Sequence, residues 1–434
     1  MDILIPLETA HRELHYKIYL CNKLALHGFK CYLGDKSSIQ QLIKNFQSFI
    51  YLDKGYHKGT SEKFYQKIKK NGGLIINLDE EGAVDFPDNQ TLKSRYDKDL
   101  FSYVDKVFMW GKSQSQLIRN RGVKGDKIVV TGHPRFELLN SKFHFLYEHE
   151  VKEIKSRYSK YILVNTNMGF GNNIRGDNFV IHNYISRFPN IKKLIKQDKL
   201  KRDKIIDFLN LFSKKSNVPV VLRPHPEENS DYYKKNLNSI ENISVEYQYS
   251  TIPWIIGCDF LIHPDCTTGI ESLIIGKKSL SLLPHELESK LITYLPVNLS
   301  LKFNDSDYLI EFMSDSKNKS QTISDEDSKQ LDDYFSLSKN ITEKIISEII
   351  NLSNNQALLP KNNLGYNILL KLYLSGFKQY ISGREKLIKN KLKGFDTLSV
   401  KNIQALLSKN ESAFSSNIVS KISRNLFLVK NSKN

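Results

Sequence analysis

Short apolar runs alternate with helical patterns through most of this 434-residue chain, and this alternation constrains its fold most. The apolar runs of the first set lie between turn residues and cover 3–7, 31–34, 48–52, 73–78, 106–110 and 127–131. Apolar residues at helical spacing occupy the segments between them, as at 11–27, 61–70 and 113–121. Strands separated by helices form parallel sheets with helices on both faces. A first doubly wound α/β domain is therefore expected at 1–150.

A second alternating set follows a charged helical connector at 143–158. Its predicted strands are short apolar runs at 161–165, 218–223, 243–247, 259–263 and 279–283, and its predicted helices cover 203–214, 251–257 and 268–275. The polar stretch 314–327 is expected to be a mobile loop, and 330–352 to be helical. The pattern predicts a second Rossmann-like domain at 151–352. Ligands of open α/β sheets bind at the carboxyl edge, so a cleft between the two edges is expected.

Charge is distributed unevenly. The chain holds 64 Lys+Arg and 47 Asp+Glu, a net +17, and residues 361–434 carry +11 of it. Excess positive charge favours an anionic partner. Apolar residues among the lysines suggest a basic helical tail at 353–434. Two readings stay open: a solvated face on helices packed against the body, or binding to an anionic membrane surface. Nucleic acid is not expected, because no nucleic-acid motif accompanies the charge.

The chain lacks several common signatures. Its four cysteines have no CxxC spacing, and HExxH, GxSxG and Walker A motifs are missing. No metal site or bound cofactor is predicted. No signal peptide and no apolar run of about 18 residues is evident. We therefore expect a cytoplasmic protein, with a peripheral position on the inner membrane as an option left open by the basic tail.

Polar residues with binding chemistry follow the strand predicted at 259–263. His263 ends that strand, and Thr267, Thr268 and Gly269 begin a helix. Small residues let a phosphate approach the free amides and the dipole of a helix N-terminus. Glu271, one turn later, is expected to accept hydrogen bonds from ribose hydroxyls. The alternative is a capped helix with Thr267 or Thr268 as N-cap.

Two further loops of the second domain are candidates. Arg223 and His225 follow a strand, and two prolines fix the loop around His225. A permanent charge and a rigidly held imidazole suit a phosphate or a proton transfer. Asn165 and Asn167 follow the first strand, in a loop rich in small polar residues and glycine that suits a diphosphate or sugar. Ordinary polar turns are the alternative in both cases.

The candidate catalytic carboxylates lie in the first domain. Asp79, Glu80 and Glu81 end one strand, and Glu8 follows another. Adjacent carboxylates repel one another unless they are exposed or used, so one of them is expected to act as a general base or nucleophile, with Glu80 or Glu81 preferred. For 79–81 the alternative is a solvated acidic turn. For Glu8 the alternative is a surface ion pair with Arg12 at i+4.

These motifs occur in a characteristic order: 5–8 with 12–13, 79–82, 131–136, 165–167, 223–226 and 266–271. Over about residues 1–350 the set resembles the two-domain GT-B glycosyltransferases, and more narrowly the bacterial surface-carbohydrate biosynthesis family of lipopolysaccharide and capsule loci. The His-Pro pair is similar to that of CMP-sugar-using transferases. This resemblance implies that His225 meets the nucleotide phosphate, that Thr267, Thr268 and Gly269 cradle it, and that Glu271 holds the ribose.

The resemblance implies a glycosyltransferase of surface polysaccharide synthesis. The donor is expected to be a nucleotide-activated sugar, with CMP-Kdo or another CMP-linked keto-sugar acid as one candidate, and the acceptor a glycan or lipid-linked glycan. A UDP-N-acetylglucosamine 2-epimerase-like enzyme is the main alternative. CDP-glycerol-type polyol phosphate transferases share the His-Pro element, and a non-catalytic nucleotide-binding assembly component is a further alternative.

Overall fold

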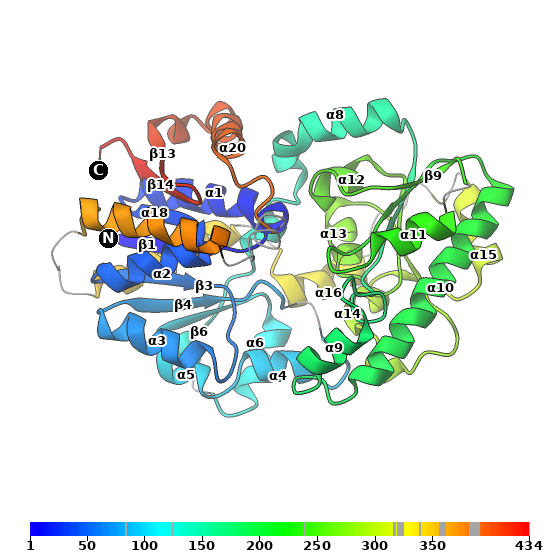
Figure 1. Ribbon diagram of the computed structural model, residues 1–434, viewed down its shortest axis with the longest axis horizontal. Coiled ribbons are helices and arrows are strands. Elements are labelled where there is room, and N and C mark those ends of the chain that lie inside the picture. Colours follow the sequence, from blue (N-terminus) through cyan, green and yellow to red (C-terminus); the bar gives the residue numbers. More distant parts are fainter. Residues whose placement is uncertain are drawn as a thin grey trace. The chain divides into compact units, whose positions relative to one another are not determined.

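A computed structural model of the chain describes residues 1–82, 85–123, 125–237, 240–315, 318, 325–337, 340–355, 362–381 and 391–433 (Figure 1). The chain forms two compact α/β units. Unit 1 comprises Met1–Gly82, Leu92–Leu146 and Lys329–Asn434, and unit 2 comprises Ala83–Thr91 and Tyr147–Ser328. Each unit is built on its own, largely parallel sheet, which confirms the predicted pair of Rossmann-like domains.

Unit 1 contains an eight-stranded sheet. Its strands are, in spatial order, β13 (Asn417–Ser423), β14 (Leu426–Asn431), β2 (Lys30–Asp35), β1 (Asp2–Leu7), β3 (Phe49–Asp53), β4 (Leu74–Leu78), β5 (Lys106–Met109) and β6 (Ile128–Val130). Strands β1 to β6 pair in parallel, and β1 is buried along its whole length. A strand that is buried on both faces needs the near-continuous apolar run that the sequence has there.

The helices of unit 1 pack around this sheet. They are α1 (Ala10–Leu26), α2 (Lys36–Asn45), α3 (Ser61–Lys70), α4 (Gln90–Arg95, which starts in unit 2), α5 (Leu100–Tyr103), α6 (Lys112–Arg119), α7 (Pro134–Glu137), α16 (Asp325–Phe335, whose first turn belongs to unit 2), α17 (Ile341–Asn354), α18 (Tyr366–Ile381) and α20 (Thr397–Asn410). Short 3₁₀ turns occur at Gly125–Lys127, Ser141–Tyr147 and Ser412–Ser416. Helix α2 was not predicted; the Asp35 carboxylate caps it by accepting a hydrogen bond from Ser38 N (2.8 Å).

Unit 2 contains a six-stranded sheet in which every pair is parallel. The strand order is β12 (Leu301–Phe303), β11 (Ser279–Leu282), β10 (Phe260–His263), β7 (Ile162–Asn165), β8 (Val220–Arg223) and β9 (Ile243–Val245). The helices are α8 (Glu148–Arg157), α9 (Asp177–Tyr184), α10 (Ile191–Lys215), α11 (Ser230–Leu237), α12 (Thr251–Gly257), α13 (Thr268–Ile275), α14 (Tyr294–Asn298) and α15 (Ser306–Ser314), with a 3₁₀ turn at Ser289–Leu291. The order places β7 in the middle of the sheet, between β10 and β8.

The unit boundaries differ from those predicted at 150 and 352. The predicted helix 330–352 is two helices, the second half of α16 and most of α17, and all of it belongs to unit 1. Phe335 of α16 packs edge-on against Phe136 (ring centroids 4.8 Å apart), and Thr342 of α17 donates to the Glu137 carboxylate. These contacts with α7 bring the chain back to the first sheet. Most of the loop predicted at 314–327 lies outside the described residues.

The tail predicted as helical at 353–434 also contains two strands. Figure 1 shows β13 and β14 (red) in the part of the chain that was expected to be a helical tail. Strand β14 runs antiparallel to β2, and Leu426 and Phe427 are fully buried. A Cβ on Gly34 of β2 would lie 2.7 Å from Leu426 Cδ1, so glycine is needed for this close approach. The C-terminal hairpin therefore completes the sheet of unit 1.

No helix in the described part of the chain combines the length and apolar character needed to cross a bilayer. The longest, α10, has 25 residues and a mixed, lysine-rich sequence. Helix α10 begins at Ile191, twelve residues before the predicted start at 203. The prediction missed these first three turns because their many lysines obscure the apolar spacing.

Truncating Leu426 should destabilise unit 1. Removing a fully buried leucine side chain costs about 2–5 kcal/mol through lost burial and the remaining cavity. We expect Leu426→Ala to lower the free energy of urea unfolding by that amount. Leu398→Ala, at an exposed position on α20, should change it by less than about 0.5 kcal/mol. Equal stability of the two variants would contradict the role of the hairpin in the core.

Candidate functional site

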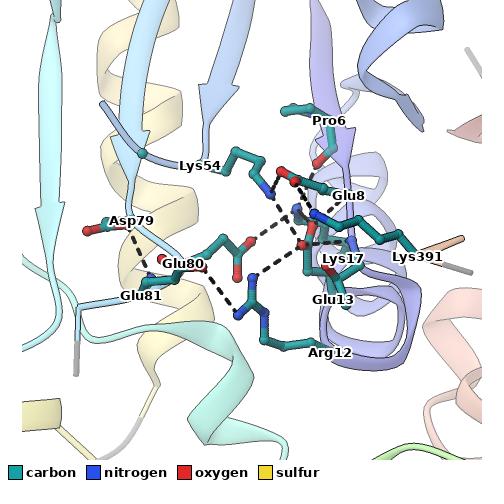
Figure 2. Close-up of polar contacts among 12 residues, drawn as sticks. Pro6, Glu8, Arg12, Glu13, Lys17, Lys54, Asp79, Glu80, Glu81 and Lys391 are labelled. Carbon is teal, nitrogen blue, oxygen red and sulfur yellow. Dashed lines mark hydrogen bonds and ion pairs between the residues drawn. The ribbon is translucent and has the colours of Figure 1, made fainter. Parts of the chain in front are cut away.

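Five carboxylates gather at the carboxyl edge of the unit 1 sheet (Figure 2). We call Glu8, Glu13, Asp79, Glu80 and Glu81 the carboxylate cluster. They follow β1 and β4, which flank β3 in the sheet, so the parallel topology brings them to one edge. The structure therefore brings together all four predicted catalytic carboxylates, Glu8, Asp79, Glu80 and Glu81, and adds Glu13 from α1.

Glu13 and Lys17 form the innermost, buried part of the carboxylate cluster. The Glu13 carboxylate accepts hydrogen bonds from Glu8 N (3.1 Å) and Thr9 N (3.0 Å) and so caps α1. Lys17 Nζ lies 2.6 Å from the same carboxylate and 2.7 Å from Pro6 O. Both side chains are almost fully buried. Lys17 was missed in the sequence, although it lies at i+4 from Glu13 on the predicted helix.

Glu80 lies inside the protein. Its Oε1 is 3.1 Å from Lys17 Nζ and accepts a short hydrogen bond from Tyr16 Oη, and its Oε2 is 3.6 Å from His133 Nε2. Burial raises the pKa of Glu80, but the nearby cations Lys17 and Arg12 outweigh it, so the pKa lies well below its usual value. Glu80 is ionised and enclosed. This geometry suits an electrostatic anchor better than a group that meets substrate.

His133 is a buried neutral imidazole. Its Nδ1 accepts a hydrogen bond from Arg135 N (3.1 Å), so the ring proton is on Nε2, which faces Glu80 without a hydrogen bond among the described residues. Burial lowers the pKa of His133 to about 3. His133 and Arg135, which belong to the sequence motif at 131–136, thus lie beside the carboxylate cluster.

Asp79 and Glu81 share one guanidinium. Arg95 lies 2.6 Å from Asp79 Oδ1 and also contacts Glu81 Oε2, while Trp110 Nε1 donates to Asp79 O (2.6 Å). Burial raises the pKa of Asp79, and the cation Arg95 opposes that rise. Arg12 approaches the other side of Glu81 at 3.7 Å. Arg95 had no signal in the sequence, because it comes from a short helix outside the strand pattern.

Glu8 is held by two lysines. Its carboxylate lies 2.6 Å from Lys54 Nζ and 3.1 Å from Lys391 Nζ. Burial opposes ionisation, but the two lysines outweigh it and lower the pKa of Glu8 to about 2. The predicted reading, in which Glu8 pairs with Arg12 at i+4, is replaced by these contacts.

Exposure separates the four predicted carboxylates. The side chain of Glu8 is 46% exposed and that of Glu81 42%, against 2% for Glu80 and 1% for Asp79. Two carboxylates are therefore accessible at this edge, Glu8 and Glu81.

In unit 2, a single buried carboxylate joins two of the predicted loops. Glu228 accepts hydrogen bonds from Thr166 Oγ1 (2.7 Å) and Met168 N (3.1 Å) after β7, and from His225 N (3.0 Å) after β8. Burial raises the pKa of Glu228, which these donors oppose. The sequence prediction passed over Glu228, although it is the last acidic residue of the predicted His-Pro loop.

Asn165 and Asn167 carry polar atoms without partners. Asn165 is buried at the end of the central strand β7, and neither its Nδ2 nor its Oδ1 has a hydrogen bond within the described residues. Asn167 donates from Nδ2 to Asp265 O (3.1 Å), and its Oδ1 is also unpartnered there. Buried polar groups are normally satisfied, so these atoms point to a bound polar molecule. The binding role of both asparagines stays a prediction.

His225 is exposed beside the loop after β7. Its Nδ1 accepts a hydrogen bond from Glu227 N (3.3 Å), and a Cβ on Gly169 would lie 3.6 Å from this Nδ1. The two loops are further joined by Ile174 N to Glu227 O (2.9 Å). The imidazole thus stands at the same edge of the sheet as Asn165.

Arg223 makes backbone contacts that the sequence does not predict. Its guanidinium donates to Gln248 O (2.7 Å) and Tyr249 O (3.0 Å) and lies over the Trp254 ring. Burial lowers its pKa to about 10. Because Nη1 and Nη2 are used on backbone carbonyls, Arg223 holds the segment after β9, while its buried Nε has no hydrogen-bond partner among the described residues.

His263 and Gly269 also differ from the prediction. His263 is fully buried, accepts a hydrogen bond from Cys266 N at Nδ1 (3.2 Å) and contacts the hydroxyls of Ser279 and Ser300 through Nε2. A Cβ on Gly269 would lie 2.3 Å from His263 Nε2, so this glycine allows α13 to pack on the sheet. Both residues are buried and form part of the core beneath the loop.

The rest of the predicted phosphate loop lies at the start of α13. Thr267 and Thr268 are half-buried, neither caps the helix through its side chain, and Glu271 is buried in the first turn. The preceding Asp265 is fixed by Lys201 Nζ (3.0 Å). Thr267 occupies the N-cap position of α13, as the alternative predicts, but its side chain makes no capping hydrogen bond.

Lys201 is a buried cation at the same edge of the sheet. It also lies 2.9 Å from Asp198, whose carboxylate accepts hydrogen bonds from Phe170 N (3.0 Å) and Gly171 N (3.2 Å). The buried ion triad Asp198–Lys201–Asp265 therefore joins the loop after β7 to the loop after β10. Asp198 and Lys201 were missed, because charged residues in the lysine-rich helix α10 do not stand out in a sequence.

Solved structures share this fold, whereas no protein-family model and no curated protein matches the sequence. The wall teichoic acid polymerase TagF, in a structure soaked with CDPG, has a TM-score of 0.53 at 12% identity, over 81% of this chain and 88% of that chain. A putative UDP-N-acetylglucosamine 2-epimerase from Listeria monocytogenes has a TM-score of 0.52 at 12% identity, over 84% and 99%. The UDP-GlcNAc 2-epimerase from Methanocaldococcus jannaschii has 0.52 at 11%, over 81% and 100%. This likeness confirms the predicted GT-B-like fold.

Protonating buried His263 should destabilise the protein. Burial lowers its pKa from 6.5 to about 4, so below pH 6.5 the unfolded state takes up a proton that the folded state does not. Stability must then fall as the pH drops, by about 2 kcal/mol from this histidine between about pH 7 and pH 5.

Urea unfolding at the two pH values measures this effect. His263→Gln should lose about 2 kcal/mol less on acidification than the wild type, whereas His182→Gln, at an exposed position, should follow the wild type. An unchanged pH dependence in His263→Gln would contradict the neutral, buried imidazole.

Proposed function

We propose that this protein is a nucleotide-sugar enzyme of surface glycan synthesis, and specifically a glycosyltransferase with a GT-B-like fold. The observation that carries the proposal is the carboxyl edge of the unit 2 sheet, which holds both the unpartnered buried amide of Asn165 and the exposed imidazole of His225. The shared fold supports it, because the TagF structure was soaked with CDPG and a related epimerase structure contains UDP-GlcNAc and UDP.

Unit 2 binds the donor in this proposal. His225 donates from Nε2 to the departing phosphate, while the loops that start at Asn165 and Thr267 supply amides and hydroxyls to the rest of the nucleotide. Preorganised donors of this kind stabilise developing negative charge without reorganisation. Glu228 and the triad Asp198–Lys201–Asp265 keep the loops in place. A CMP-linked sugar acid is the proposed donor, since the His-Pro loop resembles that of CMP-sugar-using transferases.

Unit 1 supplies the carboxylate that activates the acceptor hydroxyl. Glu81 is proposed for this role, because it is accessible and adjoins the buried anchors Asp79 and Glu80. Glu8 is the less suitable base, because a carboxylate with a pKa of about 2 takes up protons poorly. The acceptor is a glycan or lipid-linked glycan.

An epimerase is the second candidate. The two epimerase structures are covered over 99% and 100% of their length, against 88% for TagF. An epimerase converts its nucleotide sugar without any acceptor, whereas a transferase needs one. This difference separates the two activities experimentally.

A thermal-shift series with CMP, CDP, UDP and GDP tests the donor site. A nucleotide at about 100 times its Kd adds about 2.7 kcal/mol of apparent stability. CMP or CDP should raise the melting temperature of the wild type. His225→Ala should bind at least about tenfold more weakly, because a hydrogen bond to a charged group is lost.

The matched control for this series is His182→Ala, which removes an exposed histidine elsewhere in unit 2 and should bind as the wild type does. A shift with UDP alone would move the proposal to a UDP-sugar enzyme. The absence of a shift with every nucleotide would reject the donor site.

Product analysis by NMR tests the reaction. With donor and glycan acceptor, Glu81→Gln should lower kcat by at least about 100-fold and leave the nucleotide shift unchanged. Glu8→Gln, the matched loss of an exposed carboxylate in the same cluster, should lower kcat much less. A larger effect in Glu8→Gln would assign the base to Glu8, product without acceptor would identify the epimerase, and tight binding without product would indicate a non-catalytic component.

A further inference from the structure

Helix α18 presents two opposite apolar faces, and only one of them is buried. Leu372 is part of the core of unit 1, and Ile368 packs against the same cluster. The opposite side carries apolar residues at i, i+3, i+4, i+7 and i+8, all exposed by 38–77%: Tyr366, Leu369, Leu370, Tyr373 and Leu374. We call these five residues the α18 stripe. Figure 1 shows α18 (orange) beside α2 in unit 1.

A helix that is apolar on both sides needs a second apolar environment. In the described part of the chain nothing buries the α18 stripe, whereas the other exposed large apolar residues are mostly scattered singly. Isolated exposed residues of this kind are normal, but a contiguous exposed patch marks an interaction site. Two of the five residues are tyrosines, which suit a boundary between water and lipid because the ring is apolar and the hydroxyl is polar.

The charge around the α18 stripe selects the partner. Helices α18 and α2 lie side by side, and Lys371 Nζ reaches Asn45 Oδ1 at the end of α2 (3.4 Å). Neither helix sequence contains an acidic residue. Lys36, Lys44 and Lys371 are all exposed there. Exposed apolar side chains bordered by lysines are the composition of helices that lie in the interface of anionic membranes.

We propose that the α18 stripe docks unit 1 onto an anionic lipid surface. The Tyr and Leu side chains enter the boundary between headgroups and acyl chains, and the lysines of α2 and α18 meet the lipid phosphates. This inference stands without the proposed enzyme activity, since it depends on the surface of unit 1 alone. It also replaces the predicted diffuse attraction of a basic tail with a defined helix face.

Vesicle co-sedimentation of the full chain, without any nucleotide, tests the proposal. The wild type should bind phosphatidylcholine vesicles that contain phosphatidylglycerol, bind pure phosphatidylcholine vesicles at least about tenfold more weakly, and lose binding as salt is raised. The uncharged triple variant Tyr366→Ser, Leu370→Ser, Tyr373→Ser should bind the anionic vesicles at least about tenfold more weakly. Lys44→Gln with Lys371→Gln should weaken binding about fivefold or more per lysine.

The matched control removes three apolar residues of similar exposure elsewhere: Ile174→Ser, Tyr308→Ser, Leu398→Ser. It should bind vesicles as the wild type does. All replaced residues are exposed, so every variant should keep the wild-type melting temperature, which is checked first. Comparison of the two triple-serine variants shows whether vesicle binding depends on the α18 stripe or on exposed apolar residues in general.

Several results would overturn the proposal. Wild-type protein that ignores both vesicle types, equal binding to neutral and anionic vesicles, or a stripe variant that binds like the wild type would each do so. A wild-type dimer that becomes monomeric in the stripe variant, with no vesicle binding by either, would assign the stripe to self-association instead. Nucleotide shifts measured in parallel keep the outcome independent of the proposed enzyme activity.

Discussion

The parallel sheet is the constraint on which the rest of the structure depends. Parallel strands point the same way, so every loop that follows a strand emerges at one edge. In unit 1 this edge gathers the residues after β1, β3 and β4, and in unit 2 those after β7, β8 and β10. The strand order alone therefore makes neighbours of side chains that are distant in the sequence, and contacts between the loops are not required for this. The helices that connect the strands cover both faces, which leaves these edges as the places where polar groups can collect.

Buried charges then hold the loops at each edge. Burying an ion costs several kcal/mol unless partners compensate it, so a buried charge fixes the positions of its partners closely. In unit 1, Lys17 lies between Glu13 and Glu80, and in unit 2, Lys201 lies between two aspartates. Glu228 adds a third centre, with backbone and hydroxyl donors from two loops. These enclosed groups form the framework, and the exposed ones beside them, such as His225, remain available for chemistry.

The C-terminal segment contributes both to the core and to the exposed surface of unit 1, and its amino-acid composition does not distinguish the two parts. Its hairpin extends the sheet of unit 1 because β14 fits against Gly34 of β2, where no side chain intervenes. Helix α18 covers the neighbouring core with one side and leaves its stripe to solvent. The same basic, apolar composition thus serves the core in one place and forms a surface in another, and only the packing tells them apart.

The sequence by itself determined the fold class, most strand positions and the presence of polar residues at strand ends, because these depend on local apolar spacing and turn residues. It could not determine which of those polar residues face outward. Glu80 and Glu81 are adjacent, yet one is buried and the other accessible, since consecutive residues point in different directions. His263 and Arg223 match a phosphate site in residue type, but their partners are hydroxyls and carbonyls that come from distant segments. The strands of the C-terminal hairpin were likewise hidden in a lysine-rich stretch, because their pairing with β2 spans nearly the whole chain. Such long-range contacts decide burial, and burial decides which groups can react, so the accessible site was fixed only by the tertiary structure.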